Sequence, residues 1–221
     1  MKNIILEPRE IYNTDWATIL FIICAVLIAT NRQLFYTQFR EFLRLPINDK
    51  YLKIYKDPEH LNSWFFYSLY IVQIISFSFI IQLALVNFGY TTKDDFVSFI
   101  RIITVLNFFI LSKHFCEKII ASTFEINEYK DSISLYKSYH RIYLGLISLP
   151  FVIFLYYNKT CELKIINILI VILILMNVIY YLNGIKNYKK VILSNFFYFI
   201  LYLCALEIAP YFFMYYFFTK S

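Results

Sequence analysis

Long runs of apolar residues, separated by shorter polar segments, dominate the pattern along the chain. The runs cover residues 16–30, 64–88, 96–112, 143–157, 165–182 and 192–213. A helix of about 20 apolar residues crosses the ~30 Å hydrocarbon core of a bilayer, and it satisfies its own backbone hydrogen bonds there. The pattern therefore predicts an all-α fold, a polytopic membrane helix bundle. About six transmembrane helices would form a single transmembrane domain over residues 1–221.

One segment, residues 95–125, contains no proline and no glycine and becomes polar only in its last third. As one helix it would extend for roughly 45 Å, which exceeds the thickness of the hydrocarbon core. Its first two-thirds is apolar apart from Arg101 and Asn107, and its last third becomes polar at Lys113 and His114. We expect one helix that spans the membrane and then continues into water.

A basic amphipathic segment, residues 32–45, follows the first apolar run. Its phenylalanines recur at helical spacing, and its arginines lie on the other faces of the expected helix. Such a helix is suited to an anionic lipid surface. The residues expected to contact lipid are Arg32, Arg40 and Arg44. The alternative is a plain helical extension of the first transmembrane helix.

Composition and charge agree with a membrane protein and narrow its partners. The chain has 221 residues, of which 60% are hydrophobic and 16% charged, whereas soluble domains average about 45–50% apolar and 25% charged residues. The net charge of +6 does not indicate a nucleic-acid partner, because no basic stripe interleaved with aromatic residues lies outside the apolar runs. The four cysteines stand singly, so neither a zinc site nor a disulfide framework is predicted.

The distribution of lysine and arginine predicts the orientation. Most of the 21 basic residues lie in the segments that follow the first, third and fifth apolar runs. By the positive-inside rule these segments face the cytoplasm. Both termini are then expected on the opposite side, which is the periplasm in a bacterial inner membrane.

The order of these features resembles a family of small polytopic inner-membrane proteins of Bacteroidetes that carry a domain of unknown function. The elements that support the resemblance are Asn13-Thr14-Asp15-Trp16 before the first helix, the segment rich in arginine and phenylalanine after it, and the pairs Lys113-His114 and His140-Arg141. The resemblance implies a bacterial inner membrane. It implies no activity, cofactor or catalytic residue.

Two ionisable residues lie within the predicted transmembrane helices at similar depth, Arg101 in the third and Glu207 in the sixth. Charged groups in a membrane need a partner or a path to water, so we predict an ion pair that holds these two helices together. In the alternative, Arg101 extends to Asp94, Asp95 or a lipid phosphate, and Glu207 faces an outer vestibule.

Uncharged polar residues form a second set within the apolar runs: Gln73, Gln82, Asn107 and Asn177. Amide side chains form hydrogen bonds between helices in lipid. We favour this role over the alternative, in which they line a polar pathway.

The third set lies on the predicted cytoplasmic side and consists of His114, Glu117 and His140. Histidines that converge with a carboxylate could bind a metal or relay protons. We favour ordinary polar residues where a helix leaves the membrane, because the chain contains no H-E-x-x-H motif or histidine box. No metal, cofactor or catalytic residue is predicted.

No nucleotide-binding loop, dinucleotide fingerprint or serine nucleophile motif is present. The leading hypothesis is a non-enzymatic integral inner-membrane protein, a component of a cell-envelope assembly. Its expected partners are the lipid bilayer and another membrane protein or a second copy of the chain. The alternatives are a small transporter or channel with a polar path near Arg101, Asn107 and Glu207, and a lipid-modifying membrane enzyme that uses His114, Glu117 and His140.

Overall fold

The computed structural model describes residues 15–44, 64–123, 127–158 and 163–187. Over these residues the regular structure is entirely helical. The helices are α1 (Asp15–Leu34), α2 (Tyr36–Leu43), α4 (Trp64–Asn87), α5 (Phe96–Thr123), α6 (Asn127–Tyr157) and α7 (Leu163–Asn187). The predicted all-α fold is confirmed.

Helices long and apolar enough to cross a membrane account for most of the described structure. There are four in the described residues: Asp15–Leu34, Trp64–Asn87, Phe96–Phe115 and Lys137–Tyr157. In α7, the stretch Ile165–Ile179 is a shorter apolar helix. The sixth predicted transmembrane helix, residues 192–213, lies outside the described residues.

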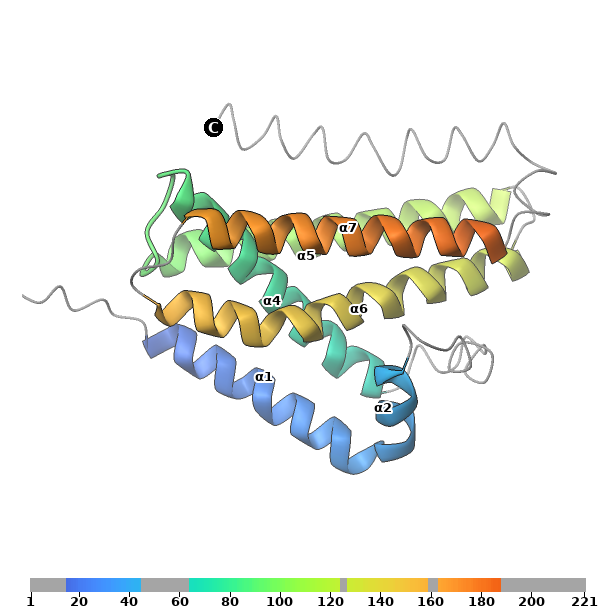
Figure 1. The fold of residues 1–221 in the computed structure, drawn as a ribbon. Coiled ribbons are helices and arrows are strands. Elements are labelled where there is room, and N and C mark those ends of the chain that lie inside the picture. The colour runs from blue at the N-terminus through green and yellow to red at the C-terminus, as the bar shows by residue number, and fades with distance from the viewer. Residues whose placement is uncertain (1–14, 45–63, 124–126, 159–162, 188–221) are drawn as a thin grey trace, which may run out of the picture.

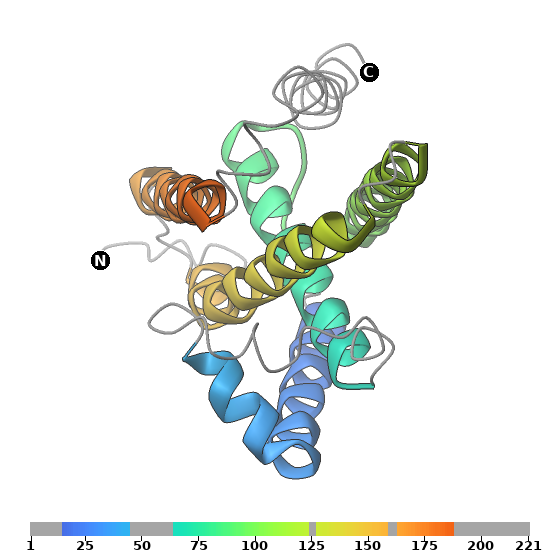
Figure 2. The same ribbon diagram turned by 90° about the vertical axis from the view of Figure 1, so that its right-hand side faces the viewer.

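Helix α4 occupies the centre of the bundle. It crosses the middle diagonally in both views (Figures 1 and 2) and contacts α1, α5, α6 and α7. Its sequence is apolar around the whole circumference, which is typical of a helix that is buried on all sides. Consistent with this position, it contributes more buried residues than either α1 or α5.

The bundle has two ends, which we define by their contacts. At the loop end, the connection between α4 and α5 lies beside the start of α1 and the end of α6, as the contacts of Trp16 with Phe96 and Tyr156 show. At the α2 end, α2 packs beside the start of α4 and the middle of α6. Successive helices therefore cross between the two ends in alternating directions, as a multi-pass chain requires.

Two clusters of apolar side chains fill these regions. Near the loop end, the Phe79 ring centroid lies 4.5 Å from that of Phe21 and 4.6 Å from that of Phe99. Near the α2 end, the Phe42 ring lies 6.0 Å from that of Phe65, and α6 contributes Tyr139. Aromatic pairs at such separations add to the packing that holds the helices together.

The connection between α4 and α5 is shaped by two local signals. After α4, Gly89 adopts a positive φ of 78°, which glycine accepts without steric cost. The Tyr90 amide donates to Leu85 O and the Gly89 amide to Val86 O, the hydrogen bonds of a Schellman motif. At the start of α5, the Ser98 amide donates to Asp95 Oδ1 at 3.1 Å, so Asp95 acts as the N-cap.

The helix boundaries agree closely with the sequence pattern for α5 and less closely for α6. The predicted helix 95–125 is α5, Phe96–Thr123. Helix α6 begins at Asn127, well before the apolar run at 143–157, and it continues through Pro150. A run of apolar residues indicates the part of a helix that lies in lipid or in a core. It does not indicate polar turns that precede this part.

Candidate functional site

Two helices approach each other closely where α4 crosses α6. A Cβ atom built on Gly145 would lie 2.7 Å from Gln73 Cα and 2.9 Å from Gln73 Cβ. A contact below 3.0 Å with a backbone atom would force one of the helices to shift, so the glycine allows the two helices to cross this closely. Gln73, predicted as a contact between helices, is 2% exposed and lies at this point.

A pair of serine hydroxyls joins the same two helices nearby. Ser76 Oγ of α4 and Ser148 Oγ of α6 are 2.9 Å apart, and both residues are fully buried. The Ser148 hydroxyl donates to Gly145 O at 3.0 Å, so Ser76 donates to Ser148. Neither serine was among the residues expected from the sequence. The signal that could have indicated this contact is the spacing of small residues, such as Gly145 and Ser148, which is typical of closely packed helices in membranes.

A second polar contact joins α1 to α4. Asn31 Nδ2 donates to Ser68 Oγ at 2.6 Å and to Leu27 O at 2.9 Å. Both side chains are buried. Sequence reasoning missed this contact, because the first predicted transmembrane helix ended at residue 30, whereas α1 continues to Leu34.

The other predicted amide residues have separate surroundings. Asn107 Oδ1 accepts a hydrogen bond from the Tyr70 hydroxyl at 3.2 Å, between α5 and α4. Gln82 is buried, and its Nε2 donates to the Asp95 backbone oxygen at 3.3 Å. Asn177 is exposed on α7. The described structure therefore does not bring the four amides together.

The ion pair predicted within the membrane is not tested by the described residues. Arg101 is exposed on α5, and Glu207 lies outside the described residues. The pair stays a prediction.

The structure describes only part of the cluster predicted on the cytoplasmic side, His114, Glu117 and His140, so the cluster stays a prediction. His114 is exposed near the end of the apolar part of α5, whereas His140 is buried within α6 at 4% exposure. The side chain of Glu117 lies outside the described part. Within that part, no group of three or more histidine, cysteine, aspartate or glutamate residues is placed to hold a metal ion.

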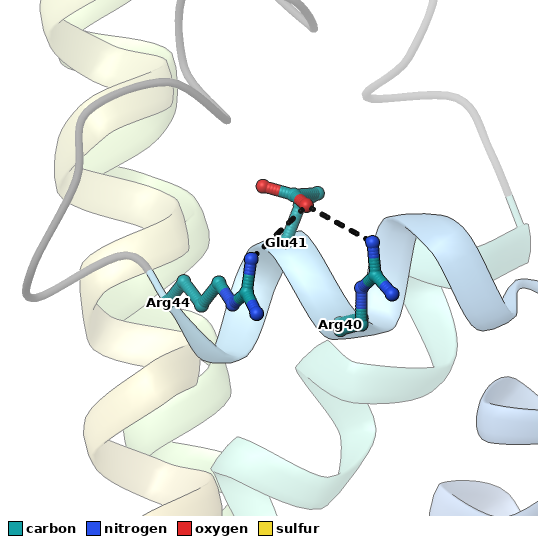
Figure 3. Close-up of polar contacts among 3 residues, drawn as sticks. All are labelled: Arg40, Glu41 and Arg44. Carbon is teal, nitrogen blue, oxygen red and sulfur yellow. Dashed lines mark ion pairs between the residues drawn. The ribbon is translucent and has the colours of Figure 1, made fainter.

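The arginines predicted to contact lipid lie at the α2 end. Arg40 and Arg44 extend from α2 on either side of Glu41 (Figure 3), with guanidinium-to-carboxylate distances of 3.8 Å and 3.9 Å. Their side chains are 53% and 60% exposed. Arg32 is exposed in the last turn of α1, before the bend at Phe35.

At the loop end, Lys93 of the α4–α5 connection forms hydrogen bonds with the C-terminal end of α6. Lys93 Nζ donates to the backbone oxygens of Leu155, Tyr156 and Asn158 at 3.5, 3.3 and 3.1 Å. In return, the Tyr156 hydroxyl donates to Lys93 O at 2.8 Å. The last carbonyls of a helix lack partners within the helix and carry partial negative charge, so the lysine satisfies and stabilises this end of α6.

Asp95 lies just before α5, outside the membrane-spanning segments. Hydrogen bonds lower the pKa of this carboxyl, first that from the Ser98 hydroxyl at 2.5 Å and then that from the Ser98 amide. The N-terminal end of α5 also favours a negative charge there. The arrangement is that of a structural cap.

These features define the class of protein. Four apolar helices of transmembrane length, packed by glycine, serine and asparagine contacts, make it an α-helical multi-pass membrane protein. More particularly, the chain belongs to the family of the domain of unknown function DUF4271, whose model matches residues 17–218. No curated protein and no solved structure matches the chain. The expected membership of a domain-of-unknown-function family is confirmed.

Proposed function

We propose that the protein is a non-enzymatic component of a cell-envelope assembly in the bacterial inner membrane. In this role the bundle acts through its packing and its surfaces, not through chemistry on a substrate. The basic segments, including α2, would face the cytoplasm and both termini the periplasm, as the positive-inside rule favours.

The observation that carries the proposal is the crossing of α4 and α6. Gly145 brings the two backbones into contact, so no passage can run between these helices at that point. The buried Ser76 and Ser148 hydroxyls satisfy each other beside it. A transport path would need polar groups that face a common space.

The remaining polar contacts support the same interpretation. Asn31 is bonded to Ser68 between α1 and α4, and Asn107 is bonded to Tyr70 between α5 and α4. Each is a separate link between α4 and one neighbour. Such links contribute about 0.6–2 kcal/mol each to helix association. Ser68, Tyr70 and Ser76 of α4 thus each link this helix to one neighbour.

The test is the stoichiometry of the full chain in its native membrane. Membranes would be cross-linked with a short amine-reactive reagent, solubilised and purified through a tag, and the mass and composition of the product measured. We expect a defined complex that contains another membrane protein or a second copy at a whole-number ratio. Recovery of the chain alone, with and without cross-linking, would contradict the proposal.

Two variants of α6 make this experiment specific: Gly145→Leu, which disrupts the crossing, and Phe154→Leu, which is its control. Gly145→Leu should lose the complex because the α4–α6 crossing cannot form, whereas Phe154→Leu, an exchange at an exposed position of α6, should preserve the fold. A complex that persists equally in the Gly145→Leu variant would show that the association does not depend on the folded bundle.

A further inference from the structure

Helix α2 runs crosswise to α1 instead of continuing along it, and it packs beside the start of α4 and the middle of α6. The backbone bends at Phe35, with φ −123° and ψ 46°. Helix α2 runs roughly perpendicular to α7. In Figure 1, α2 has little extent along the direction of α7, and in Figure 2, where α7 is seen nearly end-on, α2 lies largely in the plane of the picture. Since the apolar helices cross the membrane, a segment in this direction lies along the membrane surface.

The apolar side of α2 is occupied by the protein itself. Phe39 is 8% exposed and Phe42 is fully buried. The Phe42 ring centroid lies 6.0 Å from that of Phe65 on α4 and 5.9 Å from that of Tyr143 on α6. Helix α2 is therefore held on the bundle by its own phenylalanines, which are not available for insertion into lipid.

The side of α2 that faces away from the bundle is basic. Arg40 and Arg44 are more than half exposed, and the one carboxylate between them, Glu41, is 3.8–3.9 Å from both. Exposed ion pairs at such distances contribute little, so both guanidinium groups keep donors for other anions. Arginine is also suited to phosphate, which it binds through two parallel hydrogen bonds.

Exposed aromatic residues place this basic side at the level of the lipid headgroups. Tyr36 opens α2 with 58% exposure, and Trp64 and Tyr67 in the first turn of α4 are 67% and 50% exposed. Tryptophan and tyrosine are enriched at the membrane–water interface, where their rings lie among the headgroups. The arginines of α2 and these aromatic side chains lie at the same end of the bundle.

We propose that Arg32, Arg40 and Arg44 form a surface that binds the phosphate groups of anionic lipids in the adjacent leaflet. The occupant is a lipid headgroup and not an acidic protein, because α2 runs along the membrane surface at headgroup level. The apolar contacts of α2 with α4 and α6 fix the positions of the arginines. Binding is then electrostatic and depends on salt, whereas insertion of a free amphipathic helix would depend on its phenylalanines.

The experiment uses the full chain in nanodiscs of zwitterionic phosphatidylcholine with 20% phosphatidylglycerol. Electron paramagnetic resonance of spin-labelled lipids would give the preference of the protein for phosphatidylglycerol over phosphatidylcholine. We expect a clear preference that falls about fivefold for each arginine changed to glutamine. The R32Q/R40Q/R44Q variant should show almost none, and raising the salt concentration should reduce the preference of the unchanged protein.

Two matched variants of α2 make the result decisive. Glu41→Gln removes the acid that lies between Arg40 and Arg44 and should strengthen the preference, whereas Thr37→Gln, a neutral exchange at an exposed position, should leave it unchanged. Circular dichroism would establish that all variants are folded. An equal preference in the unchanged protein and in the R32Q/R40Q/R44Q variant would overturn the proposal. The proposal would also be overturned if these arginines bound an acidic protein in place of lipid, with binding that falls as arginines are replaced.

Discussion

Gly145 of α6 lies so close to α4 that a Cβ atom at this position would be 2.7 Å from Gln73 Cα. We predict that Gly145→Ala destabilises the bundle by about 1–3 kcal/mol, the usual cost of adding a methyl group to a packed interior. The atom in the way is backbone and cannot move aside as a side chain can. The measurement is the midpoint of thermal unfolding in detergent. Unfolding is monitored as the fraction of protein that stays monodisperse on size exclusion.

The control for this prediction is Phe154→Leu on the same helix, since Phe154 is 65% exposed. Its midpoint should remain close to that of the unchanged protein. A Gly145→Ala variant as stable as Phe154→Leu would show that α4 and α6 cross elsewhere.

The hydroxyls of Ser76 and Ser148 should be coupled energetically. In a double-mutant cycle with alanine, we expect a coupling of about 0.6 kcal/mol and at most about 2 kcal/mol, the range for hydrogen bonds between helices in lipid. Each single variant leaves one buried hydroxyl without this partner, so the double variant should lose less than the sum of the two. Stability in detergent against a denaturant series gives the four values. Strict additivity would contradict the contact.

The Asp95 cap should make the stability of the protein depend on pH. Hydrogen bonds from Ser98 lower the pKa of the Asp95 carboxyl in the folded state, whereas in an unfolded chain it is about 3.9. The carboxylate therefore stabilises the fold above the unfolded value, and this contribution is lost as the pH falls through the lower, folded pKa. Asp95→Asn keeps an N-cap acceptor but loses the charge.

We accordingly expect the unchanged protein to be more stable than Asp95→Asn near neutral pH, and the difference to vanish in acid. Ser98→Ala removes the hydroxyl donor, so it should weaken the pH dependence that Asp95 causes. Unfolding midpoints from pH 7 down to about pH 2.5 would measure this. A difference that is constant over the whole range would mean that the charge of Asp95 plays no part.

The two ends of the bundle should lie on opposite sides of the membrane. In a chain without its four natural cysteines, single cysteines would replace Tyr90 in the α4–α5 connection and Arg44 at the end of α2. Tyr90 is 71% exposed. We expect a membrane-impermeant maleimide to label Tyr90→Cys in intact spheroplasts and Arg44→Cys only after permeabilisation.

The opposite pattern of labelling would invert the proposed orientation and leave the fold intact. Labelling of both positions from the same side would instead contradict a crossing by α4. The two failures are thus distinguishable in one experiment.

Much of the fold follows from hydrophobic patterning, because bilayer thickness imposes the length of each apolar run. The prediction of one helix at 95–125 was close to Phe96–Thr123 for this reason. The extent of α6 was underestimated, since its first turns are polar and carry no apolar signal. The first predicted helix ended at residue 30 for the same reason, whereas α1 continues to Leu34.

The sequence by itself determined that the chain is an all-helical membrane protein and where most of its apolar helices lie. It left open which helix is central, because several runs are apolar on every face and composition does not rank them. Tertiary structure alone decided that α4 occupies the centre, that Gly145 meets Gln73 there, and that Ser76 bonds Ser148. The physical reason is that such contacts depend on how two helices cross, and a crossing brings together residues far apart along the chain.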